Sequence, residues 1–217
     1  MKLEAKGISR SFFRKGTNTN IFVAVKPTDF CLEEGKLTEI TGRSGCGKTT
    51  FSNMLSGLLT PTEGTVLLDE KDLYAMSDKE RSRIRCDHFG IIPQGHTGLQ
   101  SLTVLENVLL PSAMYHGDAK NAEKRARELL SQMNIADLCD VYANELSGGE
   151  LRRMAVARAL INEPEIIIAD EPTSDLDDEA SGLVLKLLKD HAKNGASVLM
   201  ITHEKDALKY ADNVLQF

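Results

Sequence analysis

The sequence predicts an α/β domain with a mainly parallel sheet, an antiparallel β region before it and an α-helical block inserted in its middle. Two observations lead to this prediction. In the C-terminal part, short apolar runs alternate with stretches of helical period, the order found in parallel sheets. In the N-terminal third, short β-like runs are separated by glycine and proline turns. The 217 residues, 41% of them hydrophobic, suffice for one domain with a substantial core, so residues 1–217 are taken as a single domain.

The N-terminal third contains four predicted strands and one predicted helix. Turn residues at Gly16, at Gly35 and over 61–64 separate the apolar runs. A helical pattern over 50–58 follows the third strand. The predicted strands cover residues 3–9, 21–30, 37–40 and 65–69.

Capping boxes mark the helices of the next segment. Ser77 with Glu80 predicts a short helix through residue 85, and Thr103 with Glu106 predicts a helix that ends near Pro111. Asp118 is expected to cap a longer helix. The apolar face of that helix comprises Ala122, Ala126, Leu129, Leu130 and Met133. A mostly helical block over about 96–160 follows from these signals.

The C-terminal part returns to strand–helix–strand order. Residues 166–169 form a continuous apolar run, as a strand buried on both faces requires, and residues 197–202 form a second. Between them, residues 178–193 have helical period. Its inward side chains are predicted to be Leu183, Val184, Leu187 and Leu188.

A glycine-rich segment between the third strand and its helix matches the phosphate-binding pattern G-x-x-x-x-G-K-[ST] in full. Glycines let backbone N–H groups approach phosphate oxygens, Lys48 can reach the β- and γ-phosphates, and the Thr49 hydroxyl can join a Mg²⁺ shell. The pattern therefore predicts a P-loop NTPase core that binds a nucleotide. The candidate phosphate-binding residues are Gly42, Arg43, Ser44, Gly45, Cys46, Gly47, Lys48, Thr49 and Thr50.

Two acids follow the buried strand over 166–169. The carboxyl ends of parallel strands are where open α/β sheets bind ligands. Asp170 is suited to orient the Mg²⁺ shell, and Glu171 is suited to polarise a water that attacks the γ-phosphate. The pair predicts hydrolysis rather than binding alone.

A second glycine-containing segment, Leu146-Ser147-Gly148-Gly149-Glu150, precedes a helical stretch over 151–160. A hydroxyl and free N–H groups at the positive end of a helix suit an anion. A simple cap explains Ser147, but a cap does not require both Gly148 and Gly149.

Together these segments resemble the ATP-binding cassette (ABC) ATPases, whose signature sequence is similar to residues 146–150. The resemblance implies a Q-loop glutamine at Gln94, which contacts Mg²⁺ or water, and a switch histidine at His203, which contacts the γ-phosphate. It also implies an aromatic ring at Phe12 that stacks on adenine, although Phe13 is an alternative. The D-loop of the family is similar to residues 174–177.

The family mechanism follows by resemblance. Two cassettes pair head to tail, as a homodimer or pseudo-dimer, so that ATP on Lys48 and Thr49 of one is covered by residues 147–149 of the other. Hydrolysis, with Glu171 as base and with Lys48, Gln94 and His203 assisting, reopens the pair. The resemblance is strongest to the lipoprotein-release, macrolide-export and antimicrobial-peptide-resistance group, and it implies a separate transmembrane permease as partner. Related importers and the cell-division cassette are the alternatives within the family.

Departures from the family pattern mark this chain. Pro93 and Gly95 flank Gln94, where an aromatic residue commonly precedes the glutamine, and Asp175 replaces a small D-loop residue. Cys46 replaces a common serine. Cys46 can be a small residue that only fills space in the loop. Alternatively, since a helix N-terminus lowers the pKa of a thiol, we hypothesise that ATP binding is sensitive to oxidants.

The composition argues against several other classes of protein. A net charge of −6 argues against a nucleic-acid partner, and the scattered Cys31, Cys46, Cys86 and Cys139 indicate a reduced compartment without structural zinc. No apolar run approaches the ~18 residues of a membrane span, and no signal-peptide core is visible. A cytoplasmic protein, peripheral at the inner face of the membrane through its permease, is expected. Two alternatives remain: a soluble non-transport ABC ATPase that acts on DNA or ribosomes, and a nucleotide-cycling scaffold.

Overall fold

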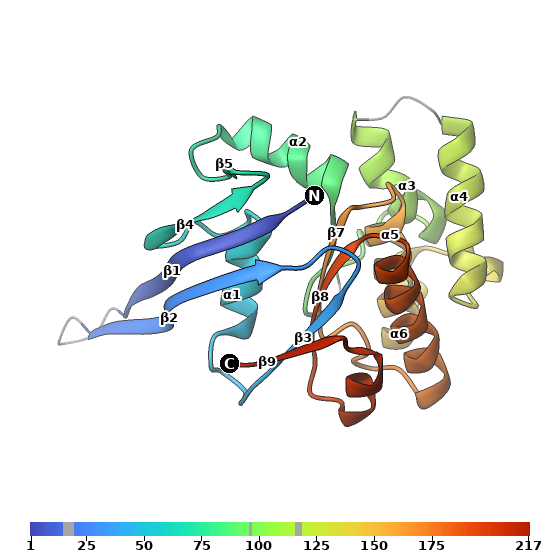
Figure 1. Ribbon diagram of the computed structural model, residues 1–217. Coiled ribbons are helices and arrows are strands. Elements are labelled where there is room, and N and C mark those ends of the chain that lie inside the picture. The colour runs from blue at the N-terminus through green and yellow to red at the C-terminus, as the bar shows by residue number, and fades with distance from the viewer. Residues whose placement is uncertain (15–19, 96, 116–118) are drawn as a thin grey trace.

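The computed structural model describes residues 1–14, 20–95, 97–115 and 119–217. Two sheets and the helices around them form the core (Figure 1). The first sheet is antiparallel, in the order β2-β1-β4-β5, and the second is parallel, in the order β6-β7-β8-β3-β9. The predicted division into an antiparallel region and a parallel sheet is therefore confirmed.

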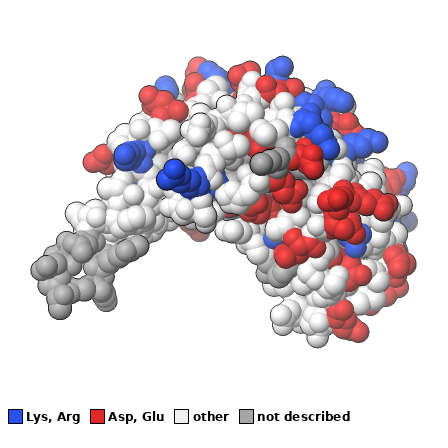
Figure 2. All heavy atoms as spheres, turned by 90° about the horizontal axis from the view of Figure 1, so that it is seen from below, with Lys and Arg blue, Asp and Glu red and all other residues white. Residues whose placement is uncertain are grey.

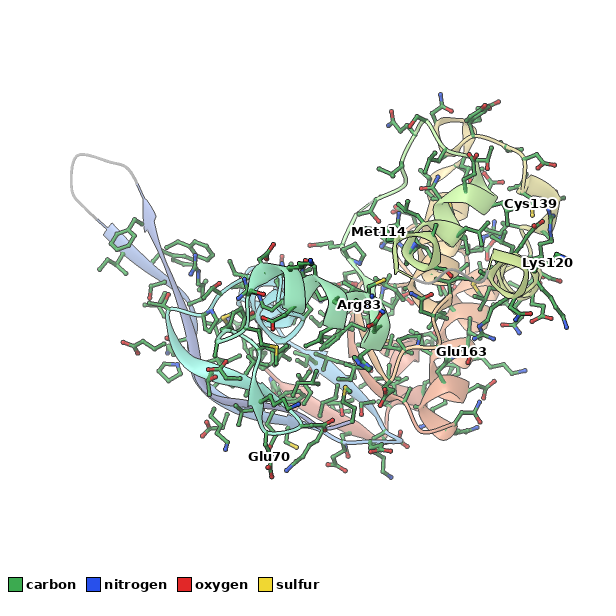
Figure 3. All side chains as sticks on the ribbon, turned by 90° about the horizontal axis from the view of Figure 1, so that it is seen from above. Glu70, Arg83, Met114, Lys120, Cys139 and Glu163 are labelled. Atoms are coloured by element: carbon green, nitrogen blue, oxygen red, sulfur yellow. The ribbon has the colours of Figure 1, made fainter. Side chains whose placement is uncertain are left out.

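The antiparallel sheet is built from the N-terminal strands. Its strands are β1 (Leu3–Arg14), β2 (Asn20–Leu32), β4 (Glu63–Leu68) and β5 (Lys71–Asp72). The first two run beyond their predicted bounds and form a long arm that projects from the body (Figures 1 and 3). Register shifts between Ala5 and Ser11 allow these strands to twist along this length.

The parallel sheet carries the residues of interest at the carboxyl ends of its strands. Strands β7 (Ile166–Asp170) and β8 (Ser197–Ile201) are buried at every residue, which explains their uninterrupted apolar sequence. Between β8 and the edge strand β9 (Asn213–Gln216) lies β3 (Leu37–Thr41), and β6 (Phe89–Ile92) forms the other edge. The sequence did not predict β6 or β9.

One apolar core separates the two sheets. Helix α1 (Lys48–Leu55) inserts Phe51, Met54 and Leu55 between Leu3 and Ile8 of β1 and the inner faces of β7 and β8. Burial of these large side chains supplies much of the hydrophobic stabilisation of this half. The phosphate-binding segment is thereby fixed between the two sheets.

A second core covers the opposite face of the parallel sheet. Its helices are α3 (Val104–Tyr115), α4 (Ala119–Gln132), α5 (Gly148–Leu160) and α6 (Asp178–Lys193). The first three fall within the predicted helical block and form a lobe on the side away from the antiparallel sheet. Figure 3 shows Met114, Lys120 and Cys139 on this lobe and Glu70 on the opposite side of the molecule. The short 3-10 helices are η1 (Ala136–Leu138), η2 (Ala143–Glu145) and η3 (Lys205–Tyr210).

Local capping chemistry is confirmed at the predicted positions. Ser77 and Glu80 exchange hydrogen bonds at the start of α2 (Asp78–His88), and Thr103 and Glu106 do so before α3. The predicted end of α3 near Pro111 is wrong, because the helix continues to Tyr115. Proline costs the helix one hydrogen bond and a steric adjustment, which the packing of α3 against α4 and α5 outweighs.

Two details of the helical faces also differ from prediction. In α6, Val184 and Leu188 are buried as expected, but Leu185 is buried while Leu183 and Leu187 are half-buried. The buried face is therefore rotated toward Leu185. In α4 the predicted apolar face is buried except at its N-terminal end, where Ala122 is half-buried; Asp118 and Gly16 lie outside the described residues.

Candidate functional site

The segment between β3 and α1 forms a loop in which glycine is required by geometry. Gly45 and Gly47 have φ of 77° and 105°, in the left-handed region, and a Cβ at Gly47 would overlap the Ala24 carbonyl. The Lys48 ammonium lies 2.8 Å from the Gly42 carbonyl oxygen and 3.0 Å from that of Arg43. The side chain is only 6% exposed, so the ammonium is held inside the loop.

A cavity of about 280 Å³ opens beside this loop, where the carboxyl ends of β7 and β8 meet the β1–β2 arm. It brings together most residues of the predicted nucleotide site, while Gly42, Arg43 and Cys46 belong to the loop without lining the cavity. Its lining residues are Phe12, Phe22, Ala24, Ser44, Gly45, Gly47, Lys48, Thr49, Thr50, Gln94, Asp170, Glu171 and His203.

The donor set for a divalent cation lies at the bottom of this cavity. Asp170 ends β7 and is 4% exposed, and its Oδ2 atom is buried without a hydrogen-bond partner among the described residues. Burial raises the pKa of Asp170, while a hydrogen bond from Thr49 and the charge of Lys48 act in the opposite direction. A buried carboxylate oxygen with no partner, beside a threonine hydroxyl, fits the oxygen ligands that Mg²⁺ prefers.

Glu171 is placed by an unusual backbone conformation. Its φ is 51°, which non-glycine residues rarely adopt, and its N–H donates to the Ile201 carbonyl of β8 at 2.8 Å. The Oε1 atom lies 3.1 Å from Nε2 of His203. Burial raises the pKa of Glu171, and the neighbouring His203 counteracts this effect. A carboxylate whose pKa is raised toward neutrality is a better proton acceptor.

The opposite end of the cavity is aromatic. Phe12 and Phe22 are direct partners in the β1–β2 register, and both line the cavity. The Arg10 guanidinium lies 4.8 Å from the centre of the Phe12 ring. Phe13 is 75% exposed and does not line the cavity, so the geometry favours Phe12 over Phe13 as a stacking surface.

The second glycine-containing segment lies in a different cavity, of about 510 Å³. Ser147 caps α5 and exchanges hydrogen bonds with Glu150, as a capping box. Gly149 approaches the loop after β7 so closely that a Cβ would lie 3.0 Å from the Asp175 carbonyl oxygen. The cavity lies between this helix start and that loop, and among the described residues none lines both this cavity and the first.

Surface charge is unevenly distributed around these features. Viewed from below, the surface is hollowed between the β1–β2 arm and the helical half, and acidic side chains gather on the half away from the arm (Figure 2). Among the described residues, no helix has the length and apolar character needed to cross a membrane.

Comparison with known proteins identifies the fold of the site. The family model described as ABC transporter matches residues 25–174, more than half of the chain. The chain belongs to the ABC transporter family. The predicted P-loop NTPase fold and the predicted ATPase activity of a transporter subunit are thereby confirmed.

Curated relatives of this cassette fall in the expected group. The bacitracin export ATP-binding protein BceA of Halalkalibacterium halodurans is 37% identical over 98% of the cassette and 83% of that relative. The lipoprotein-releasing system ATP-binding protein LolD 1 of Caulobacter vibrioides is 38% identical, covering 93% and 86%. The macrolide export ATP-binding/permease protein MacB of a Shewanella species is 34% identical over 99% of the cassette but 33% of that relative.

A solved structure agrees with this assignment. The dimeric post-hydrolysis structure of the ATP-binding cassette MJ0796, bound to ADP and Pi, superposes with a TM-score of 0.92. It is 33% identical in sequence, and the match covers 99% of this cassette and 94% of that chain.

The sequence analysis did not predict three residues that lie in or near the site. Phe22 and Ala24 line the first cavity from β2, and Arg152 of α5 is 2% exposed and donates hydrogen bonds to Pro93 and Ser174. The register of β2 against Phe12 is the signal that identifies Phe22, and it requires the strand pairing. An arginine on an otherwise apolar helical face is the signal for Arg152.

Proposed function

We propose that two copies of this cassette pair head to tail and enclose two ATP molecules between them. One observation carries the proposal: residues 147–149 and the phosphate loop lie in separate cavities of one chain, which share no lining residue in the part of the chain that the structure describes. A second copy, placed head to tail, supplies residues 147–149 opposite Lys48. The dimeric structure of the related cassette MJ0796 supports this arrangement.

Within each composite site, the roles follow from position. The loop 42–50 binds the phosphates, Phe12 stacks on adenine, and the α5 N-terminus of the partner caps the γ-phosphate with Ser147, Gly148 and Gly149. Glu171 accepts a proton from the attacking water. His203, whose Nε2 atom lies 3.1 Å from the Oε1 atom of Glu171, contacts the γ-phosphate.

Thr49, Asp170 and Gln94 are the residues that would hold Mg²⁺. All three residues line the same cavity. When bound, Mg²⁺ supplies charge that offsets the negative charge of the β- and γ-phosphates.

The cassette powers a separate transmembrane permease. The relative MacB, whose name includes a permease, is about three times as long as the region it shares with this cassette. BceA and LolD are named as ATP-binding proteins of export or release systems. We infer that residues 1–217 form a single ABC ATPase domain that works on the cytoplasmic face of the cell membrane, held there by its permease.

The deciding experiment measures the solution mass of Glu171→Gln with and without ATP by light scattering. ATP that binds but is not hydrolysed should convert monomer to dimer. Glu171→Gln combined with Lys48→Ala is the matched control and should stay monomeric, because Lys48 binds the phosphates. A Glu171→Gln variant that binds ATP and stays monomeric would contradict pairing by the cassette alone.

A further inference from the structure

Arg152 is the largest fully buried side chain among the described residues, and its burial requires an explanation. A buried charge is costly unless it is paired and hydrogen-bonded. Its Nη1 atom donates to the Pro93 carbonyl at 2.9 Å, and its Nη2 atom donates to the Ser174 hydroxyl at 2.7 Å. The carboxylates of Asp175, Asp170 and Glu171 attract the guanidinium, although burial lowers its pKa.

Each partner of Arg152 adjoins a residue of the proposed hydrolytic site. Pro93 immediately precedes Gln94. The Ser174 hydroxyl, which accepts from Arg152, donates in turn to the Glu171 carbonyl oxygen at 3.0 Å. The Ser174 N–H also donates to that oxygen, at 3.3 Å. A continuous path of hydrogen bonds therefore runs from α5 through Arg152 and Ser174 to the backbone of Glu171.

The backbone of Glu171 needs such support. A φ of 51° in a non-glycine residue persists only where surrounding contacts hold it. The Ile201 carbonyl holds the N–H of Glu171 from the sheet, and Ser174 holds its carbonyl from the loop. Near the start of α5, Gly149 packs against the Asp175 carbonyl. Through Gly149 and Arg152, α5 therefore contacts the loop after β7 at two places.

We propose that Arg152 is a positioning residue for ATP hydrolysis, which acts through Ser174 on the backbone of Glu171. Arg152 lies five residues after Ser147, near the start of α5. It therefore also connects the helix start, which caps the nucleotide bound to the partner, with Glu171, which acts on the nucleotide bound to the same chain. The inference rests on the proposed role of Glu171 as the base.

The test is a double-mutant cycle on the ATPase activity of the full chain. Ser174→Ala removes the linking hydroxyl and keeps the arginine. It should lower kcat between about tenfold and a hundredfold, because a misplaced catalytic group costs that much, with KM for ATP unchanged. Ser174→Thr keeps a hydroxyl and should restore most of the turnover. Ser174→Ala with wild-type kcat would overturn the proposal.

Arg152→Met removes both hydrogen-bond donors and keeps an unbranched side chain. Because Arg152 acts through Ser174, the double variant Arg152→Met/Ser174→Ala should be no slower than Arg152→Met alone. The matched control is Arg158→Met, which removes a half-buried arginine of α5 that donates to the carbonyl and hydroxyl oxygens of Thr97 at 2.7 and 2.6 Å. The fold-reductions in kcat caused by Arg158→Met and by Ser174→Ala should multiply in the double variant. If the fold-reductions caused by Arg152→Met and Ser174→Ala also multiply, the link between Arg152 and Ser174 is refuted.

The same assay separates this inference from the proposed function. If Glu171→Gln hydrolyses ATP at the wild-type rate, the role of Glu171 is wrong. If Glu171→Gln is inactive while the fold-reductions in kcat caused by Arg152→Met and Ser174→Ala multiply, only the positioning role of Arg152 is wrong.

Discussion

The Nε2 atom of His203 lies 3.1 Å from the Oε1 atom of Glu171, across the gap between the loop after β8 and the loop after β7. The histidine side chain is half-exposed while the carboxylate is largely enclosed, so the pair spans the boundary between cavity and solvent. Burial raises the pKa of Glu171, and the charge of His203 partly offsets that effect.

Removal of His203 should therefore change the pH dependence of hydrolysis. Wild-type kcat should fall on the acid side as Glu171 takes up a proton, at a pH above the ordinary carboxyl range, because burial raises its pKa. His203→Ala should move this acid limb to higher pH, since the counteracting partner is gone, and should also lower the plateau. A pH–rate profile of both proteins gives the shift. An acid limb that stays in place would mean that His203 does not act on Glu171.

Replacement of Ser147 by arginine should abolish cooperative hydrolysis and spare ATP binding to the monomer. In the proposed pair, the bulky cation would block the helix start that faces the partner's nucleotide. Loss of the cap itself costs about 1 kcal/mol of stability. Ser77→Arg on α2 is the matched control, because Ser77 forms the same capping box away from either cavity. The Hill coefficient for ATP should fall to one in the first variant and stay unchanged in the second.

Cys46 should report on occupancy of the phosphate loop. Its Sγ atom lies 3.8 Å from Nζ of Lys48, so an added group there intrudes on the phosphate position. Alkylation with iodoacetamide should abolish ATP binding, and bound ATP should slow the reaction. Cys31, which is exposed, is the control thiol and should react equally with and without ATP. Full modification of Cys46 with ATP affinity intact would exclude this role.

Glu39 should make stability depend on pH. It is 1% exposed in β3, its Oε2 atom has no hydrogen-bond partner among the described residues, and burial raises its pKa. The native protein then holds the proton to higher pH than the unfolded chain does, so this contribution is full below the ordinary carboxyl pKa and is lost as pH rises through the native value. Glu39→Gln should raise Tm relative to wild type at pH 8, and by less at pH 5.

Thermal unfolding across this pH range measures the Glu39 effect. Glu128→Gln, at a half-exposed carboxylate of α4, is the control and should show no such trend. If the difference in Tm between Glu39→Gln and wild type is constant from pH 5 to pH 8, the effect comes from packing and not from ionisation.

Local chemistry explains which parts of the fold were predictable. The phosphate loop and the capping boxes at Ser77, Thr103 and Ser147 are short motifs whose hydrogen bonds close within a few residues. Asp170 and Glu171 were predictable because a fully buried strand reads as a continuous apolar run.

Long-range packing explains the rest. Strand β6 follows α2 without a turn residue, and β9 is an edge strand with exposed positions, so neither gives a clear local pattern. Helix α3 continues through Pro111 because its neighbours hold it. Phe22 depends on a register that shifts within β1, and Arg152 depends on two loops that are distant in sequence.

The separation of the two cavities on one chain has a genetic consequence. A chain with Lys48→Ala lacks its own phosphate site but offers an intact Ser147, and a chain with Ser147→Arg is the reverse. In a mixed pair, one composite site carries both lesions and the other carries neither. Two inactive alleles expressed together should therefore complement each other, whereas either one alone should remain without transport.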